Sequence, residues 1–215
     1  MKIIRPRAAL AIPIDGDAII ASLEKIGRVC YKSEDRIAEG SAGAFIKAII
    51  RRGHESVIEH AGVSVRVICD RGVSHEIVRH RIASYSQEST RYCNYSDDKF
   101  DNGLTFVKPC FFSENCEAYD IWLECMEHAE KSYLKMLADG VEPQFARSVL
   151  PNSLKTELVM TMNLREWRHF IRLRTAKSSH PQMREISFMI LEILKAGVPY
   201  IFDEFDDAKN NNAEN

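Results

Sequence analysis

The spacing of apolar residues changes along this chain, and that change constrains the fold more than any other feature. Residues 63–69 alternate apolar with more polar side chains, the pattern of a half-buried strand. Before them, 17–31 and 41–52 carry apolar residues at helical spacing. The two periods in one chain predict an α+β or α/β fold.

The remaining segments continue this mixture. Helical patterns are found at 73–81, 114–138, 143–149, 163–174 and 181–197, and strand patterns at 104–107 and 154–162. The polar and aromatic stretch 84–94 has no clean period, which predicts a loop. Because the sequence contains neither a GxGxxG nor a GxxxxGK[ST] motif, any nucleotide must be held in another way.

Composition limits the class of protein. With 215 residues, 45% hydrophobic and 28% charged, we expect one globular domain over 1–202 and a flexible, acidic, Asn-rich tail over 203–215. No apolar run approaches the roughly 20 residues that span a bilayer, and no signal-peptide pattern occurs, so we expect a cytoplasmic protein. A net charge of -2 argues against a general nucleic-acid binder.

The six cysteines contain no CxxC pair, which argues against a zinc knuckle or a thioredoxin-like motif. Cys116, Cys125 and His128 lie in a helical pattern without a fourth ligand. We therefore expect reduced thiols and no metal.

An arginine motif, Arg79-His80-Arg81, lies at the end of a predicted helix. Side chains two positions apart on a helix diverge, so Arg79 and Arg81 should serve two different ligands unless the backbone turns there. The following loop adds donors that suit phosphate and a pyrimidine edge, namely Ser84, Ser86, Gln87, Ser89 and Arg91. A salt-bridged helix end followed by a capping loop explains the same residues.

A second arginine cluster lies in the helical pattern 163–174. Arg174 follows the apolar Trp167 and Phe170 by seven and four positions, so its guanidinium should point inward. Such a charge either pairs with a buried carboxylate or meets a substrate. The other stripe, Arg165, His169 and Arg172, is equally consistent with a solvated basic face.

The segment His54-x-Ser56-x-x-Glu59-His60 groups ionisable residues within seven positions. This spacing is not HExxH, because its histidines are six apart rather than four. A metal or catalytic cluster and a role for Ser56 and Glu59 at a turn or helix start both remain open.

Together these motifs resemble the flavin-dependent thymidylate synthases, whose hallmark is RHR, seven residues, then S-x-R. Here Arg79-His80-Arg81 is followed at that spacing by Ser89-Thr90-Arg91. The likeness covers roughly 50–190, with His54-Glu55-Ser56, Arg147 before Leu150-Pro151, and Asn163 to Arg174 in order. The resemblance implies a central, mainly antiparallel sheet flanked by helices, and a homotetramer with active sites shared between subunits.

The resemblance also implies a role for individual residues. The FAD-binding residues would be Ser56, Arg79, His80, Arg81, Gln87, Asn163, Leu164, Arg165 and His169. The dUMP-binding residues would be Glu76, Ile77, Val78, Arg79, Gln87, Glu88, Ser89, Thr90, Arg91, Arg147 and Arg174. Arg174 would be catalytic, by binding the pyrimidine and favouring ionisation at N3.

The implied reaction is reductive methylation of dUMP to dTMP. Methylenetetrahydrofolate would donate the one-carbon unit, NADPH would reduce FAD, and the reduced flavin would supply hydride. Some relatives carry Glu where Gln87 stands and Asn where His169 stands, and the spacing from Arg174 to His180 leaves the role of His180 open. The rival functions are a nucleic-acid-binding protein whose arginines contact phosphates and a catalytically inactive, flavin-binding relative.

Overall fold

The computed structural model describes residues 1–205, and the chain divides into two compact units. The first unit comprises Met1–Arg7, Val67–Arg79 and Tyr85–Val159, and the second comprises Ala8–Arg66, His80–Ser84 and the described chain from Met160. The single domain expected over 1–202 stays a prediction. Most of the expected tail lies outside the described residues, although Asp203–Phe205 form a short 3-10 helix, η6.

The strands form two sheets. Their bounds are β1 Lys2–Ile4, β2 Arg7–Leu10, β3 Gly62–Asp70, β4 Ser84–Gln87, β5 Thr105–Val107 and β6 Lys155–Asn163. The larger sheet has the order β2-β3-β6-β4, while β1 and β5 form a separate parallel pair with Lys2 opposite Thr105. The prediction of a mixed α+β fold with a mainly antiparallel sheet flanked by helices is confirmed.

The α-helices agree closely with the helical periods of the sequence. Their bounds are α1 Gly16–Arg28, α2 Ser41–Arg51, α3 Arg71–Ile77, α4 Glu117–Ala138, α5 Pro143–Ala146, α6 Leu164–Arg174 and α7 Pro181–Gly197. Short 3-10 helices connect them, namely η1 Val29–Tyr31, η2 Glu34–Arg36, η3 Glu55–His60, η4 Asp98–Phe100 and η5 Arg147–Val149. Among the described residues, none of the helices is both long and apolar enough to cross a membrane.

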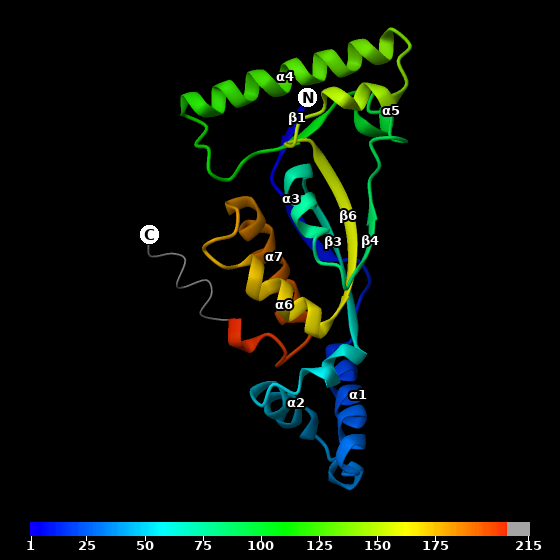
Figure 1. Cartoon of the computed structure of the whole chain (residues 1–215), viewed down its shortest axis with the longest axis vertical. Coiled ribbons are helices and arrows are strands. Elements are labelled where there is room, and N and C mark those ends of the chain that lie inside the picture. Colours follow the sequence, from blue (N-terminus) through cyan, green and yellow to red (C-terminus); the bar gives the residue numbers. More distant parts are fainter. Residues whose placement is uncertain (206–215) are drawn as a thin grey trace. The chain divides into compact units, whose positions relative to one another are not determined.

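The first unit has its own apolar core, to which the long helix α4, labelled in Figure 1, contributes several side chains. Trp122, Met126 and Tyr133 project from α4 into a buried cluster with Tyr95 and Phe106. Burial of such aromatic and apolar surface stabilises the unit by about 25 cal/mol per Å² of apolar area removed from water.

The second unit packs α6 beside α7 (Figure 1). Trp167, Phe170 and Ile171 of α6 are fully buried, as their helical spacing predicts. The indole Nε1 of Trp167 donates to the carbonyl of Val63 at 3.0 Å, which ties α6 to β3. Asn163 begins the helix, because its side-chain oxygen accepts from the amide of Glu166 at 2.9 Å.

Two boundaries around the arginine motif differ from the prediction. Helix α3 ends at Ile77 rather than continuing to Arg81, so the motif follows the helix instead of lying on it. The expected divergence of Arg79 and Arg81 on a helix is therefore wrong in its basis, because neither residue lies on α3. The chain leaves the helix here, and the ring of His80 becomes buried in the second unit.

The predicted loop over 84–94 is wrong at its start, where Ser84–Gln87 form strand β4. Hydrogen bonds join this polar strand to β6. Gln87 Nε2 donates to Thr156 Oγ1 of β6 at 3.1 Å, and the amide of Glu88, next to the strand, donates to the carbonyl of Glu157 at 2.8 Å. Pairing with a neighbouring strand decides this conformation, and no local pattern of apolar residues shows it. Strands β1 and β2 were also not predicted.

Candidate active site

The histidine of the arginine motif lies in a buried chain of polar side chains. The side chain of His80 is only 3% exposed, and its Nδ1 lies 3.3 Å from Glu166 Oε1. On the other side of the ring, Arg174 Nε donates to His80 Nε2 at 3.0 Å. The ring also packs against Phe170, with ring centroids 4.8 Å apart. Arg174 therefore contacts an imidazole here, a partner that no local pattern in the sequence indicates.

The charge state of His80 follows from this environment. Burial, the guanidinium of Arg174 and the ring of His169 lower the pKa of His80 from 6.5 to about 4. The imidazole is accordingly neutral at pH 7. Burial raises the pKa of Glu166, and the interaction with His169 acts in the opposite direction.

His80, Glu166 and His169 also form a group whose ligand atoms lie within 4.8 Å of one another, close enough for a metal ion. A cation bound there would sit next to the guanidinium of Arg174, which contacts the same imidazole. The arrangement therefore favours a hydrogen-bonded chain over a metal site. The expectation of no metal stays a prediction.

A cavity of about 570 Å³ lies against the first turns of α6. Asn163, Arg165 and His169, all expected at the flavin, line it together with Ile82. Its other lining residues are Glu55, Glu59, Glu166 and Arg172. The structure thus brings three of the expected flavin residues to one hollow.

The basic stripe of α6 is exposed, as one of the two interpretations expected. It is not a row of isolated cations, because Arg165 donates to Glu59 and Arg172 donates to Glu204 at 2.9 Å.

Ser56, another expected flavin residue, lies in a different hollow. It is exposed on η3 and lines a cavity of about 650 Å³ with His54, Arg28, Arg36 and Arg52. Residues 55–60 form a 3-10 helix, in agreement with the turn interpretation of that segment.

The first unit gathers most of the residues expected at the nucleotide. Several of their side chains already have partners: Gln87 Nε2 donates to Ser74 Oγ at 3.0 Å, and Glu88 accepts from Tyr95 Oη at 2.8 Å and from Lys155 Nζ. Burial, and then the charge of Glu88, raise the pKa of Tyr95, so its phenol remains a donor. These contacts shape the segment after β4.

Two exposed arginines border the same segment. Arg147 Nη1 donates to Thr90 Oγ1 at 3.5 Å, and Arg91 Nε donates to Gln144 Oε1 at 3.1 Å. The guanidinium of Arg91 also lies over the ring of Tyr92, 5.2 Å from its centroid. Arg91 and Arg147 thus border the segment that carries Ser89, whose hydroxyl accepts from the amide of Arg91 at 3.3 Å, and the three residues form a cluster suited to a phosphate.

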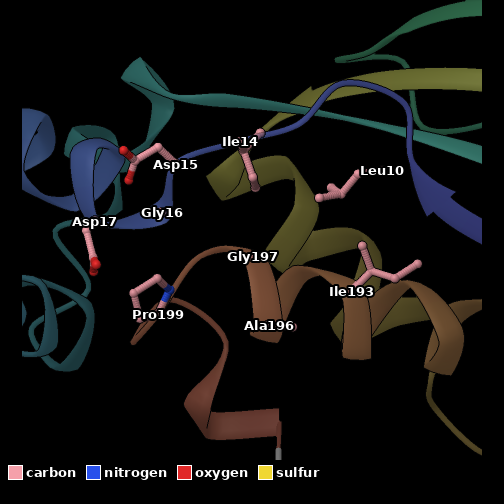
Figure 2. A pocket seen from close by; sticks show the side chains of 9 residues that line it. All are labelled: Leu10, Ile14, Asp15, Gly16, Asp17, Ile193, Ala196, Gly197 and Pro199. Atoms are coloured by element: carbon pink, nitrogen blue, oxygen red, sulfur yellow. The ribbon is translucent and has the colours of Figure 1, made fainter.

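A further cavity, of about 790 Å³, lies between the start of α1 and the end of α7 (Figure 2). Leu10, Ile14, Ile193 and Pro199 line it with Gly16 and other residues of these two helix ends. None of the expected site residues lines this cavity. We therefore do not assign the active site to this cavity, although its volume exceeds that of the cavity at α6.

Comparison with known proteins identifies the family. The family model described as thymidylate synthase complementing protein matches residues 17–200. A flavin-dependent thymidylate synthase of Pyrococcus furiosus is 34% identical over 84% of this chain and 73% of its own length. One from Geobacter sulfurreducens is 33% identical over 85% of this chain and 80% of its own length. This chain belongs to the flavin-dependent thymidylate synthase family.

The fold agrees with that assignment. A UMP/dUMP methylase, PolB, from Streptomyces cacaoi, solved with 5-Br dUMP, superposes with a TM-score of 0.77. The alignment covers 95% of this chain and 96% of the methylase, at 24% identity. At this identity the likeness establishes a shared fold.

The residues that the thymidylate synthase family implies are divided between the two units. The first unit holds Glu76, Ile77, Val78, Arg79, Gln87, Glu88, Ser89, Thr90, Arg91 and Arg147. The second unit holds Ser56, His80, Arg81, Asn163, Leu164, Arg165, His169 and Arg174. The side chains of Ile77 and Leu164 are fully buried, so only their backbone atoms can face a ligand.

One arginine of the second cluster has a structural role in this family member. Arg168 is 1% exposed and pairs with Glu55 at 3.2 Å and with Glu204 at 2.8 Å. Burial alone would raise the pKa of Glu204, but hydrogen bonds and charge from Arg168 and Arg172 lower it. The sequence carried a signal for this role, because Arg168 lies in the apolar stripe between Leu164 and Ile171.

Proposed function

We propose that this chain converts dUMP to dTMP by reductive methylation, with methylenetetrahydrofolate as the one-carbon donor and NADPH as the reductant through FAD. Membership of the family over 17–200 carries this proposal. The arrangement around the arginine motif supports it, since a guanidinium, an imidazole and a carboxylate form one chain next to the α6 cavity.

The α6 cavity suits part of a flavin. Its volume of about 570 Å³ lies in the usual range of ligand pockets, and Asn163, Arg165 and His169 supply amide, guanidinium and imidazole groups. Arg81, exposed beside His80, adds another donor to the same unit. When bound, FAD would supply the hydride-transfer chemistry that no side chain can provide.

The cluster of Ser89, Arg91 and Arg147 suits the phosphate of the nucleotide. Both arginines are exposed, and each is oriented by a neutral partner, Thr90 or Gln144. A neutral partner orients a guanidinium without cancelling its positive charge, so the group can still attract an anion. Gln87 and Glu88 would shape this segment through the contacts that already hold their side chains.

Arg174 would act on the pyrimidine ring. Its Nε donates to the neutral imidazole of His80 at 3.0 Å, which fixes the plane of the guanidinium. A fixed guanidinium next to the ring stabilises negative charge that develops at N3 and the neighbouring carbonyl oxygen. This activation would replace the attack of a cysteine thiolate on the ring.

We also infer a homotetramer in the cytoplasm, with active sites shared between subunits. Large apolar side chains are exposed near the site residues of each unit, namely Tyr92 at 76% and Phe145 at 62% in the first and Ile82 at 68% and Leu173 at 47% in the second. Aromatic residues such as Tyr92 and Phe145 are enriched where proteins associate, and the family resemblance carries the rest of this inference.

The direct test is release of the C5 hydrogen of tritium-labelled dUMP by purified protein reconstituted with FAD. We expect a yellow protein that turns over only when methylenetetrahydrofolate and NADPH are both present.

Arg174→Ala should lower turnover by about 100-fold while sparing flavin content, because it removes one charge-stabilising donor. Glu127→Ala, an exposed change on α4, is the matched control. A protein that cannot be reconstituted with FAD contradicts the proposal.

A further inference from the structure

Glu166, which lines the α6 cavity, also contacts the histidine of the arginine motif. Its side chain is 11% exposed and its Oε1 lies 3.3 Å from His80 Nδ1. It occupies the third helical position after the cap Asn163, where a glutamate often turns back to bond the backbone amide of the cap. Here its carboxylate is instead directed to the imidazole.

The hydrogen bonds define which nitrogen of His80 carries the proton. The Nε of an arginine can only donate, so His80 Nε2 must accept at 3.0 Å. The proton of the neutral ring is then on Nδ1 and is donated to Glu166 Oε1. A carboxylate on the far nitrogen also raises the basicity of Nε2 and strengthens its bond with the guanidinium.

The hydrogen bonds that run from Glu166 through His80 to Arg174 restrict the position of the Arg174 side chain. Glu166 and Arg174 come from the first and last turns of the same helix, and the imidazole connects them. The ring itself is held by Phe170, 4.8 Å between centroids, and by His169, 5.7 Å between centroids. The bond to His80 uses Nε, so it sets the plane of the guanidinium and the direction of its terminal nitrogens.

We propose that Glu166 is a positioning residue for the nucleotide: through the Nδ1 proton of His80 it holds the imidazole in the tautomer that orients Arg174. This inference rests on the proposed function, since it takes Arg174 as the group that meets the pyrimidine. Glu166 acts through His80 and need not touch the substrate.

The test compares Glu166→Ala with Glu166→Gln in the FAD-loaded, full-length protein. The alanine variant removes the acceptor of the Nδ1 proton, whereas glutamine keeps an acceptor oxygen of the same reach. We expect Glu166→Ala to weaken dUMP binding, measured by calorimetry, by about tenfold, and Glu166→Gln to stay within about threefold of wild type. Because Glu166 also lines the α6 cavity, flavin content is measured for each variant and dUMP affinity is compared in fully FAD-loaded protein, with Glu127→Ala as the control.

A readout that does not depend on activity separates this inference from the proposed function. In protein labelled with ¹⁵N-histidine, the ring signals of His80, assigned by their loss in His80→Asn, should show a protonated Nδ1 and an unprotonated Nε2 at pH 7. The opposite tautomer overturns the inference, as does dUMP affinity that Glu166→Ala leaves unchanged or that both variants lower equally. Wild-type protein with this tautomer but without dUMP binding contradicts the proposed function and leaves the hydrogen-bonded chain in place.

Discussion

At the scale of single residues, the burial of a neutral histidine ties stability to pH. His80 has an ordinary pKa of 6.5 in the unfolded chain and of about 4 in the folded protein, where burial and Arg174 oppose its charge. Between these two values the unfolded state binds more protons than the folded state. The free energy of unfolding therefore falls as pH falls from about 6.5 to about 4, and His80 contributes no further change below that.

We predict that this dependence disappears in His80→Gln. One proton gives a slope of up to about 1.4 kcal/mol per pH unit in wild type, which the variant should lack. Glu166, Arg174 and His169 face the ring and are present in both proteins, so the comparison isolates His80. Urea denaturation between pH 4.5 and 7 measures it, with His128→Gln on the surface of α4 as the control. Parallel stability curves for wild type and His80→Gln contradict the prediction.

At the scale of elements, the start of α1 packs closely against the end of α7 at Gly16. A Cβ at Gly16 would lie 2.3 Å from the carbonyl oxygen of Gly197 and 2.8 Å from Cδ of Pro199. Figure 2 shows the three residues around this contact. Backbone and a proline ring cannot yield as the end of a flexible side chain can, so the two helices meet at this distance only without a side chain at position 16.

We therefore expect Gly16→Ala to destabilise the protein by about 1–3 kcal/mol, because the clash forces α1 away from α7. Asp17→Ala, at the next and exposed position, should change stability by less than about 0.5 kcal/mol. Thermal and urea denaturation of the two variants and of wild type measure the change in the free energy of unfolding. A Gly16→Ala variant as stable as wild type would contradict the prediction, because it would show that α1 and α7 can separate here without loss of stability.

At the scale of the whole molecule, the inferred homotetramer makes a direct prediction. Light scattering should give a mass about four times 24.6 kDa, and specific activity should fall on dilution below the dissociation constant, since shared active sites need neighbouring subunits. Phe145→Glu, which puts a charge on an exposed aromatic of α5, should shift the mass toward smaller species. A fully active protein of 24.6 kDa contradicts the inference.

Much of the architecture was determined by the sequence alone. The alternation over 63–69 predicts β3, since one face of a strand is buried and the other is not. The apolar stripe of Trp167 and Phe170 likewise predicts the buried face of α6. These patterns are local, because hydrophobic burial acts on residues brought to one face by backbone geometry. The order of the arginine motifs predicted the family.

Only the tertiary structure decided the details of the site. The polar strand β4 and the ion pairs of Arg168 both depend on partners far away in the chain, such as Thr156 for Gln87 and Glu204 for Arg168. Hydrogen bonds and ion pairs are directional and short-ranged, and no periodicity in the sequence encodes them. The contact between Glu166 and His80 is an example, because the two residues are 86 positions apart in the sequence and only the fold brings them together.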